Sequence, residues 1–131
     1  MSKPTLALIL LPDLFAICRL PPDTPLPAWA ARVAHGDFVS ITRTADELSI
    51  VCPQAGVPAG VHAALDWRCL KVAGPLDFAL TGVMVALAAP LAQVGISVFA
   101  VATYDTDYLL IQSADLPRAR AALTGAGHDV R

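Results

Sequence analysis

The second half of the chain carries the sequence pattern that decides the fold. It contains LDFALTGVMVALAAPLAQVG (Leu76–Gly95) and, directly after it, ISVFAVATYDTDYLLIQ (Ile96–Gln112). The first segment has the length and composition of a buried helix, and the second reads as two strands around the polar turn YDTD. A further helix is predicted for ADLPRARAALTGAG (Ala114–Gly127), because Asp115 and Pro117 open it and glycines follow its end.

Short strands are predicted on either side of these elements. WRCLKV (Trp67–Val72) precedes the first helix, and HDV (His128–Val130) follows the second. The resulting order, strand–helix–strand–strand–helix–strand, is the ferredoxin-like arrangement. In the first helix Asp77 is a candidate N-cap, and Pro90 is expected to bend the last turns.

The first half of the chain shows a similar run with a weaker first helix. Strands are predicted at LALILL (6–11), LFAICRL (14–20), FVSIT (38–42) and ELSIV (47–51), a short helix at AWAARVA (28–34), and at most a short helix at VHAAL (61–65). Four residues recur at an offset of 61, namely Thr42, Asp46, Leu48 and Ile50 as Thr103, Asp107, Leu109 and Ile111. We therefore expect an α+β protein of two tandem ferredoxin-like subdomains, residues 1–65 and 66–131, with antiparallel sheets and helices on one face.

The composition indicates a globular chain with a covered apolar face. Of the 131 residues 56% are hydrophobic and only 15% are charged, so we expect a homodimer. The net charge of −2, with scattered basic residues, argues against nucleic-acid binding. The uncharged run from Phe78 to Tyr104 is long enough to cross a bilayer, but Pro90 and Gly95 divide it, so no membrane contact is expected.

Neither the cysteines nor the histidines form a recognisable catalytic or metal-binding set. The three cysteines are far apart, which indicates buried, reduced thiols in a cytoplasmic protein. The histidines have no acidic or cysteine partner nearby in sequence, and exposed loop positions are expected for them. These residues are Cys18, Cys52, Cys69, His35, His62 and His128. Since no nucleophile–base pair is visible either, no cofactor is expected, and an enzyme is the weakest functional hypothesis.

GPLDFALTG (Gly74–Gly82) is the more specific of two candidate binding features. A strand that ends in Gly-Pro leads through a loop into a helix, so unpaired N–H groups at the helix N-terminus can receive an anion such as a carboxylate. Gly82 permits a close approach of the backbone. The alternative is that Gly-Pro forms a turn and that Gly82 is a packing contact.

The turn YDTD supplies the second feature, a pair of aspartates. Aspartate favours turns because its side chain bonds nearby backbone N–H groups, so Asp105 and Asp46 can be turn-forming residues only, and this interpretation leads. Alternatively, Asp107 accepts a hydrogen bond from a ligand ammonium. A divalent metal is less well supported, because hard cations need more oxygen ligands than this turn offers. A carboxylate binder beside an ammonium binder describes a site for a zwitterionic amino acid.

The segment Gly74–Ala119, together with SITRTADELSIVCP (Ser40–Pro53), resembles the small bacterial proteins with tandem ACT modules. These proteins are related to the ACT modules of the CASTOR arginine sensors. The glycine loop, APLA, GIS and TYDTDY occur in order at compatible spacing. The resemblance implies a regulatory protein without chemistry of its own, which binds a small effector where two modules pack.

The resemblance also implies the ligand-binding residues and a selectivity. The residues carried over are Asp77, Phe78, Ala79, Leu80, Thr81, Gly82, Thr103, Tyr104 and Asp107. Where an arginine-sensing module has an acidic residue, this chain has Leu80, which argues for a neutral or apolar effector. An unidentified protein target is implied, because no enzyme is fused to the modules. A structural or interaction protein with an empty pocket is the main alternative.

Overall fold

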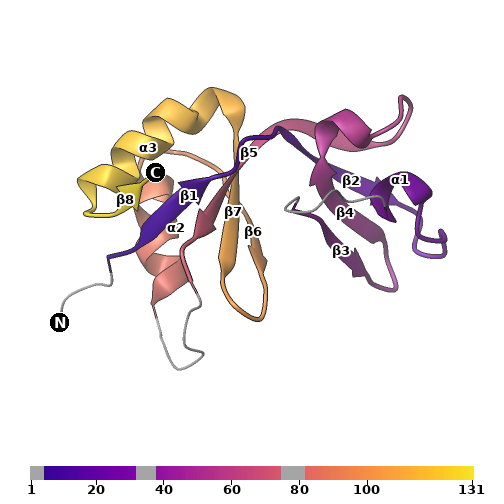
Figure 1. Cartoon of the computed structure of the whole chain (residues 1–131), viewed down its shortest axis with the longest axis horizontal. Helices are drawn as coiled ribbons and strands as arrows, with labels where there is room; N and C mark the ends of the chain where they lie inside the picture. The colour runs from indigo at the N-terminus through magenta and orange to yellow at the C-terminus, as the bar shows by residue number, and fades with distance from the viewer. Residues whose placement is uncertain (1–4, 32–37, 75–81) are drawn as a thin grey trace. The chain divides into compact units, whose positions relative to one another are not determined.

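The computed structural model describes residues 5–31, 38–74 and 82–131, and within these ranges it has an α+β fold (Figure 1). The strands are β1 (Ala7–Leu10), β2 (Phe15–Leu20), β3 (Ser40–Arg43), β4 (Leu48–Pro53), β5 (Ala63–Val72), β6 (Phe99–Ala102), β7 (Asp107–Gln112) and β8 (Asp129–Val130). The helices are α1 (Ala28–Ala31), α2 (Val83–Gln93) and α3 (Leu116–Gly125), with 3-10 turns η1 (Gln54–Gly56) and η2 (Ser113–Asp115). The predicted fold class is confirmed. No helix in the described ranges is long and apolar enough to span a membrane.

Packing divides the chain into two compact units. The N-terminal unit is Asp13–Trp67, and the C-terminal unit combines Met1–Pro12 with Arg68–Arg131. Strand β5 belongs to both units, because its first half pairs with β2 and its second half pairs with β1. The expected boundaries of the two modules, residues 1–65 and 66–131, stay a prediction. By packing, the first twelve residues belong with the second unit.

The C-terminal unit has the ferredoxin-like order β5-α2-β6-β7-α3-β8 with one added strand. β1 lies between β8, to which it is parallel, and β5, to which it is antiparallel. Alternate strand residues pack against both helices in one core, so α2 and α3 cover the same face of this sheet (Figure 1). The core consists of Leu8, Leu70, Val72, Val83, Leu87, Leu91, Ile96, Leu109, Ile111, Ala119 and Leu123.

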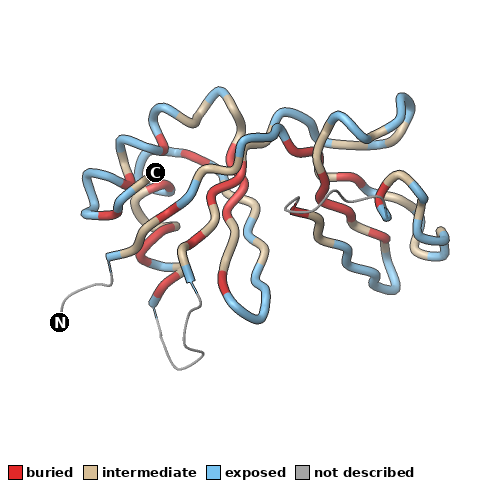
Figure 2. The backbone as a smooth tube through the Cα atoms, in the orientation of Figure 1, coloured by how far each residue is buried: buried red, intermediate tan, exposed pale blue. Residues whose placement is uncertain are grey.

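The N-terminal unit has the same order of elements, strand–helix–strand–strand, from β2 through α1 and β3 to β4. Its sheet runs β3-β4-β2-β5, and its core contains Ala16, Cys18, Ala30, Leu48, Ile50 and Cys52. After β4, however, η1 leads through a loop directly into β5. The helix allowed for at VHAAL is therefore wrong. Ala63 and Ala64 pair with β2 instead, because this ladder supplies their backbone hydrogen bonds. In Figure 2 the buried positions of both units recur along the strands.

A β-bulge interrupts β5 just before it passes from one unit to the other. The register with β2 shifts between Phe15 and Ile17, and Asp66 has a left-handed backbone with φ of 69°. The side chain of Gln54 holds this conformation. Its Oε1 accepts the Asp66 N–H at 2.6 Å, and its Nε2 donates to Asp66 Oδ1 at 3.0 Å.

The two hairpins do repeat, but with an offset of 59 residues instead of 61. Thr44 N–H donates to the Glu47 carbonyl at 2.9 Å, and Thr103 N–H donates to the Thr106 carbonyl at the same distance. The strands that follow, β4 and β7, begin 59 residues apart, as do η1 and η2. The offset of 61 is therefore wrong, because it matched residue types and not the turn. Asp107 corresponds to Leu48, and Asp46 corresponds to Asp105.

Helix α2 begins later than its sequence suggested. Gly82, and not Asp77, occupies the N-cap position of α2, with φ of 79°, a left-handed conformation outside the helical region. The N-cap assigned to Asp77 is therefore wrong, and Asp77 itself lies outside the described residues. Pro90 lies inside α2, which continues to Gln93. Pro90 offers no N–H to the carbonyl of Ala86, the residue four positions before it.

His128 supplies the hydrogen bond that Pro90 cannot give. Its Nε2 lies 2.9 Å from the Ala86 carbonyl, and its Nδ1 accepts the Leu6 N–H at 3.1 Å. Because an N–H group must donate, Nδ1 is the acceptor, and the imidazole carries its proton on Nε2. The exposed position expected for His128 is wrong, since only 5% of this residue is accessible. His62 is exposed as expected, and His35 lies outside the described residues.

Replacing His128 by leucine should destabilise the protein by about 2–4 kcal/mol, because the buried carbonyl of Ala86 and the part-buried N–H of Leu6 both lose their partner. The replacement Pro90→Ala restores an N–H that can donate to the Ala86 carbonyl. In the Pro90→Ala background the cost of His128→Leu should therefore fall by about 1 kcal/mol or more. Urea unfolding of the four proteins in this cycle measures the coupling, and additive costs would contradict the proposed role of His128.

Candidate functional site

The β6–β7 hairpin ends in a turn closed by two threonines. Thr103 Oγ1 lies 2.9 Å from the Thr106 carbonyl and 3.3 Å from the Thr106 N–H, so this one hydroxyl bonds both backbone groups. Asp105 lies within the turn, which agrees with its expected turn-forming role. Tyr104 is 80% exposed. The turn thus presents its middle residues to solvent while its ends are tied together.

Thr106 joins this turn to the end of β5. Its side chain is buried, and its Oγ1 donates to the Val72 carbonyl at 2.7 Å. Val72 is the last residue of β5 and lies two positions before Gly74. The bond therefore holds the turn beside the point where the chain leaves the sheet towards α2. Sequence reasoning missed Thr106, although the spacing of two threonines around Tyr104-Asp105 is a signal for such a turn.

Asp107 is the first residue of β7 and pairs with Ala102. It lies on the same face of the sheet as Leu109 and Ile111, whose side chains pack in the core beneath the helices. In the N-terminal unit the equivalent residue is Leu48, which is fully buried. Asp107 is half-buried, and its carboxylate has no hydrogen bond or ion pair in the described part of the chain. A carboxylate thus occupies a place where the fold puts a core leucine.

The N-terminus of α2 lies at the same end of the sheet. Val83, its first residue, packs in one cluster with Val72 and Leu109. Gly82 is exposed, and as the N-cap residue it offers no side chain to the first N–H groups of α2. Of the predicted ligand loop only Gly82 is described. The predicted residues Asp77, Phe78, Ala79, Leu80 and Thr81 lie outside the described residues.

The thiols of this protein are unsuited to catalysis. All three cysteines are free and buried. Burial raises the pKa of Cys69 to about 12. The pKa of Cys52 is also raised to about 12, mainly by burial and further by the charge of Cys18 and a hydrogen bond with it. Neutral thiols are poor nucleophiles and poor metal ligands. Within the described ranges no three His, Cys, Asp or Glu residues lie close enough to hold a metal ion.

Comparison with known proteins identifies both units separately. The model of the ACT domain matches residues 63–125, and a second family model, of an N-terminal domain, matches residues 13–60. The human protein CASTOR3P is 32% identical over 93 residues, which are 61% of this chain and 57% of that protein. The chain thus spans little more than half the length of this curated relative.

Solved structures extend the similarity to the whole chain. Protein Atu0741 from Agrobacterium tumefaciens is 41% identical with a TM-score of 0.91, covering 98% of this chain and 94% of its own. The ligand-free regulatory subunit of aspartate kinase from Thermus thermophilus is 16% identical with a TM-score of 0.59, covering 87% and 93%. At this identity the second similarity concerns the fold only.

Replacing Thr106 by valine should cost about 1–3 kcal/mol of unfolding free energy, because the buried Val72 carbonyl loses its donor while the volume hardly changes. Thr106→Ser keeps the hydroxyl and is the matched control. Chemical denaturation compares the two variants. Equal stabilities would show that the hydroxyl does not hold the turn to β5.

The native thiols should resist alkylation by iodoacetamide at about pH 8.5, where ordinary thiols react readily. In denaturant all three cysteines should react. Since the folded-state pKa of Cys52 and Cys69 lies above the unfolded value, their contribution to stability is complete below about pH 8.5 and is lost as the pH rises towards 12. Mass spectrometry counts the modified thiols, and rapid native labelling would refute their burial.

Proposed function

Because this chain belongs to the ACT-domain family, we propose that it is a non-catalytic regulatory module that binds an amino acid at its C-terminal unit. The carboxylate of Asp107 carries this proposal. Asp107 is half-buried on the face of β7 that carries the core residues, and its carboxylate has no hydrogen bond or ion pair in the described part of the chain, whereas the corresponding residue of the other unit is a buried leucine. A ligand that brings a positive charge to Asp107 would give this carboxylate a partner.

The effector's carboxylate is assigned to the N-terminus of α2. The first N–H groups of α2, to which Gly82 offers no side chain, and the helix dipole favour an anion there, and Gly82 in the N-cap position lets the ligand approach the backbone. Thr81 and the rest of the loop from Asp77 would enclose the ligand. The bond from Thr106 to Val72 supports this assignment, since it keeps the turn close to the chain that leads into α2.

The ammonium of the effector is assigned to Asp107. A charge-assisted hydrogen bond of this kind contributes about 1.5–3 kcal/mol net. Thr103 ties the turn that precedes Asp107, and Asp105 shapes it. Phe78, Ala79 and Leu80 would line the side-chain end of the pocket, with Tyr104 at its exposed outer edge, so a neutral or apolar amino acid fits better than a cationic one.

The proposal includes the setting in which the module acts. Three free thiols support a reducing, cytoplasmic location. With no catalytic set proposed, the effector signal would pass to a separate protein target. The site would be completed where two ACT modules pack, and we propose that the protein is a homodimer.

Calorimetric titration tests the role of Asp107. A thermal-shift panel of amino acids first identifies the effector, since a ligand that binds only the folded state raises the melting temperature. For that amino acid, Asp107→Asn should weaken binding by about 10- to 150-fold, whereas Asp105→Asn should leave affinity nearly unchanged.

Two other outcomes would count against the proposal in different ways. If Asp107→Asn binds as tightly as the parent while folded, the ammonium assignment is wrong but the module still binds amino acids. If no amino acid raises the melting temperature, the protein is an interaction module with an empty pocket.

A further inference from the structure

Every polar group of Thr106 is bonded within the C-terminal unit. Its Oγ1 donates to the Val72 carbonyl at 2.7 Å, and its N–H donates to Thr103 Oγ1 at 3.3 Å. Its carbonyl accepts from both the N–H and the Oγ1 of Thr103, each at 2.9 Å. Only 4% of Thr106 is accessible, so these hydrogen bonds are largely shielded from water. The residue directly before Asp107 is therefore fixed through its hydroxyl, its N–H and its carbonyl.

These bonds act on Asp107 through the peptide group that joins it to Thr106. The carbonyl held by Thr103 belongs to that peptide group, so the group cannot rotate without breaking two hydrogen bonds. The Asp107 carboxylate itself has no hydrogen bond or ion pair in the described part of the chain. Its position therefore depends on the backbone at the start of β7, where Asp107 pairs with Ala102.

The N-terminal unit lacks both the carboxylate and its support. At the two equivalent positions it has Glu47 and Leu48. Its turn is linked to β2 in a different way, by Arg19, whose exposed guanidinium donates to the Asp46 carbonyl at 3.0 Å. The buried hydroxyl thus occurs in the unit that has a carboxylate to position.

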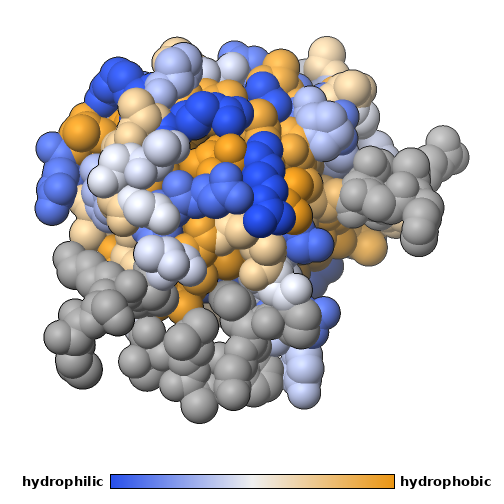
Figure 3. All heavy atoms as spheres, turned by 60° about the vertical axis from the view of Figure 1, so that its left-hand side comes forward, coloured by the Kyte–Doolittle hydropathy of each residue, from blue (hydrophilic) through white to orange (hydrophobic). Residues whose placement is uncertain are grey.

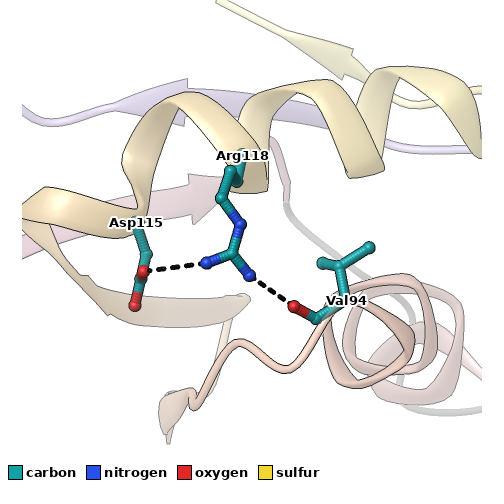
Figure 4. Close-up of polar contacts among 3 residues, drawn as sticks. All are labelled: Val94, Asp115 and Arg118. Carbon is teal, nitrogen blue, oxygen red and sulfur yellow. Dashed lines mark hydrogen bonds and ion pairs between the residues drawn. The ribbon is translucent and has the colours of Figure 1, made fainter.

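Helix α2 is held by two polar contacts that do not involve this turn. Arg118, which pairs with Asp115 at 3.4 Å, donates through Nη2 to the Val94 carbonyl (Figure 4). His128 bonds the Ala86 carbonyl at 2.9 Å. Loosening the turn should therefore leave the N-terminus of α2, to which the effector's carboxylate is assigned, in place.

Helix α2 also offers no second carboxylate for an ammonium. It has no charged residue from Val83 to Gln93. Figure 3 shows hydrophobic surface between hydrophilic side chains on the side of the molecule where Figure 1 has α2 and α3. An ammonium that loses Asp107 thus finds no replacement on this helix.

We propose that Thr106 is a positioning residue for the effector's ammonium and acts through Asp107. The inference rests on the proposed function, since it needs an amino acid bound at Asp107. A charge-assisted hydrogen bond depends on distance and angle, and a binding group has to be held within about 0.5 Å of its productive position. The bond from Thr106 to Val72 supplies this constraint. Its loss should weaken binding of the ammonium end and leave the carboxylate end unaffected.

Calorimetric titration of the full chain tests this role with two probes. The first is the amino acid that gives the largest shift in the thermal-shift panel. The second is the same acid without its amino group, which is isocaproic acid in the case of leucine. Thr106→Val should weaken binding of the amino acid about 5-fold or more and leave binding of the second acid unchanged. Thr106→Ser keeps the hydroxyl and should restore the parent's affinity.

A second pair of variants keeps the test decisive if Thr106→Val does not fold. Thr103→Val removes a hydroxyl that bonds the Thr106 carbonyl, and it should weaken binding of the amino acid only. Thr44→Val makes the identical change in the equivalent turn of the N-terminal unit and should leave both affinities unchanged. Circular dichroism confirms that each variant is folded.

The double variant shows whether Thr106 acts through Asp107. In the Asp107→Asn background Thr106→Val should cost little further affinity, because the carboxylate that it positions is already gone. Additive losses overturn the inference, as does equal weakening of both probes or parent affinity in folded Thr106→Val. In each of these cases the loss caused by Asp107→Asn alone still measures the proposed function. A parent protein that binds no amino acid overturns both.

Discussion

The fold of the C-terminal unit depends on one buried imidazole. His128 accepts the N–H of Leu6, 122 positions earlier in the chain, and bonds the carbonyl that Pro90 leaves without a helical partner. Strand β1, helix α2 and the approach to β8 therefore meet at a single side chain. Burying two backbone groups without partners would cost more than the net contribution of ordinary hydrogen bonds, so the three elements are not independent. The same contact adds to the two ladders that hold β1 between β5 and β8.

A second constraint, the buried hydroxyl of Thr106, links the fold to the proposed function. It ties the β6–β7 turn to the last residue of β5. This contact brings a turn and a strand end to the same edge as the first residues of α2, where helix polarity favours an anion. Asp107, half-buried at the start of β7, follows this turn directly. The turn that precedes a carboxylate is thus tied to the strand end from which the chain leads towards α2.

The two units show how one hairpin serves different purposes. Threonine closes both turns, and the strands that follow have nearly the same burial pattern. The N-terminal unit has Leu48 where the C-terminal unit has Asp107, and a loop where the C-terminal unit has α3. We therefore propose ligand binding at the unit that has both helices. The bulge at Asp66, held by Gln54, lies where β5 passes between the units.

The sequence by itself determined the local elements, because their signals are short-ranged. The periodicity of β7, the opening of α3 by Asp115 and Pro117, and the reuse of a threonine-closed hairpin are all visible in the chain and are present in the structure. The family resemblance added the ACT-like fold. The residues proposed to bind the ligand follow from that resemblance, and of the loop only Gly82 is described.

Tertiary structure decided what depends on residues far apart. The burial of His128, the placement of β1 with the second unit, and the bond from Thr106 to Val72 join positions between 34 and 122 residues apart. The residues next to a histidine or threonine in sequence do not predict such a partner, because an imidazole or hydroxyl can equally be exposed or bonded to a distant carbonyl. The late start of α2 has the same origin. Local propensity extends the helix to Asp77, whereas in the structure Gly82, with a left-handed backbone, occupies the N-cap position.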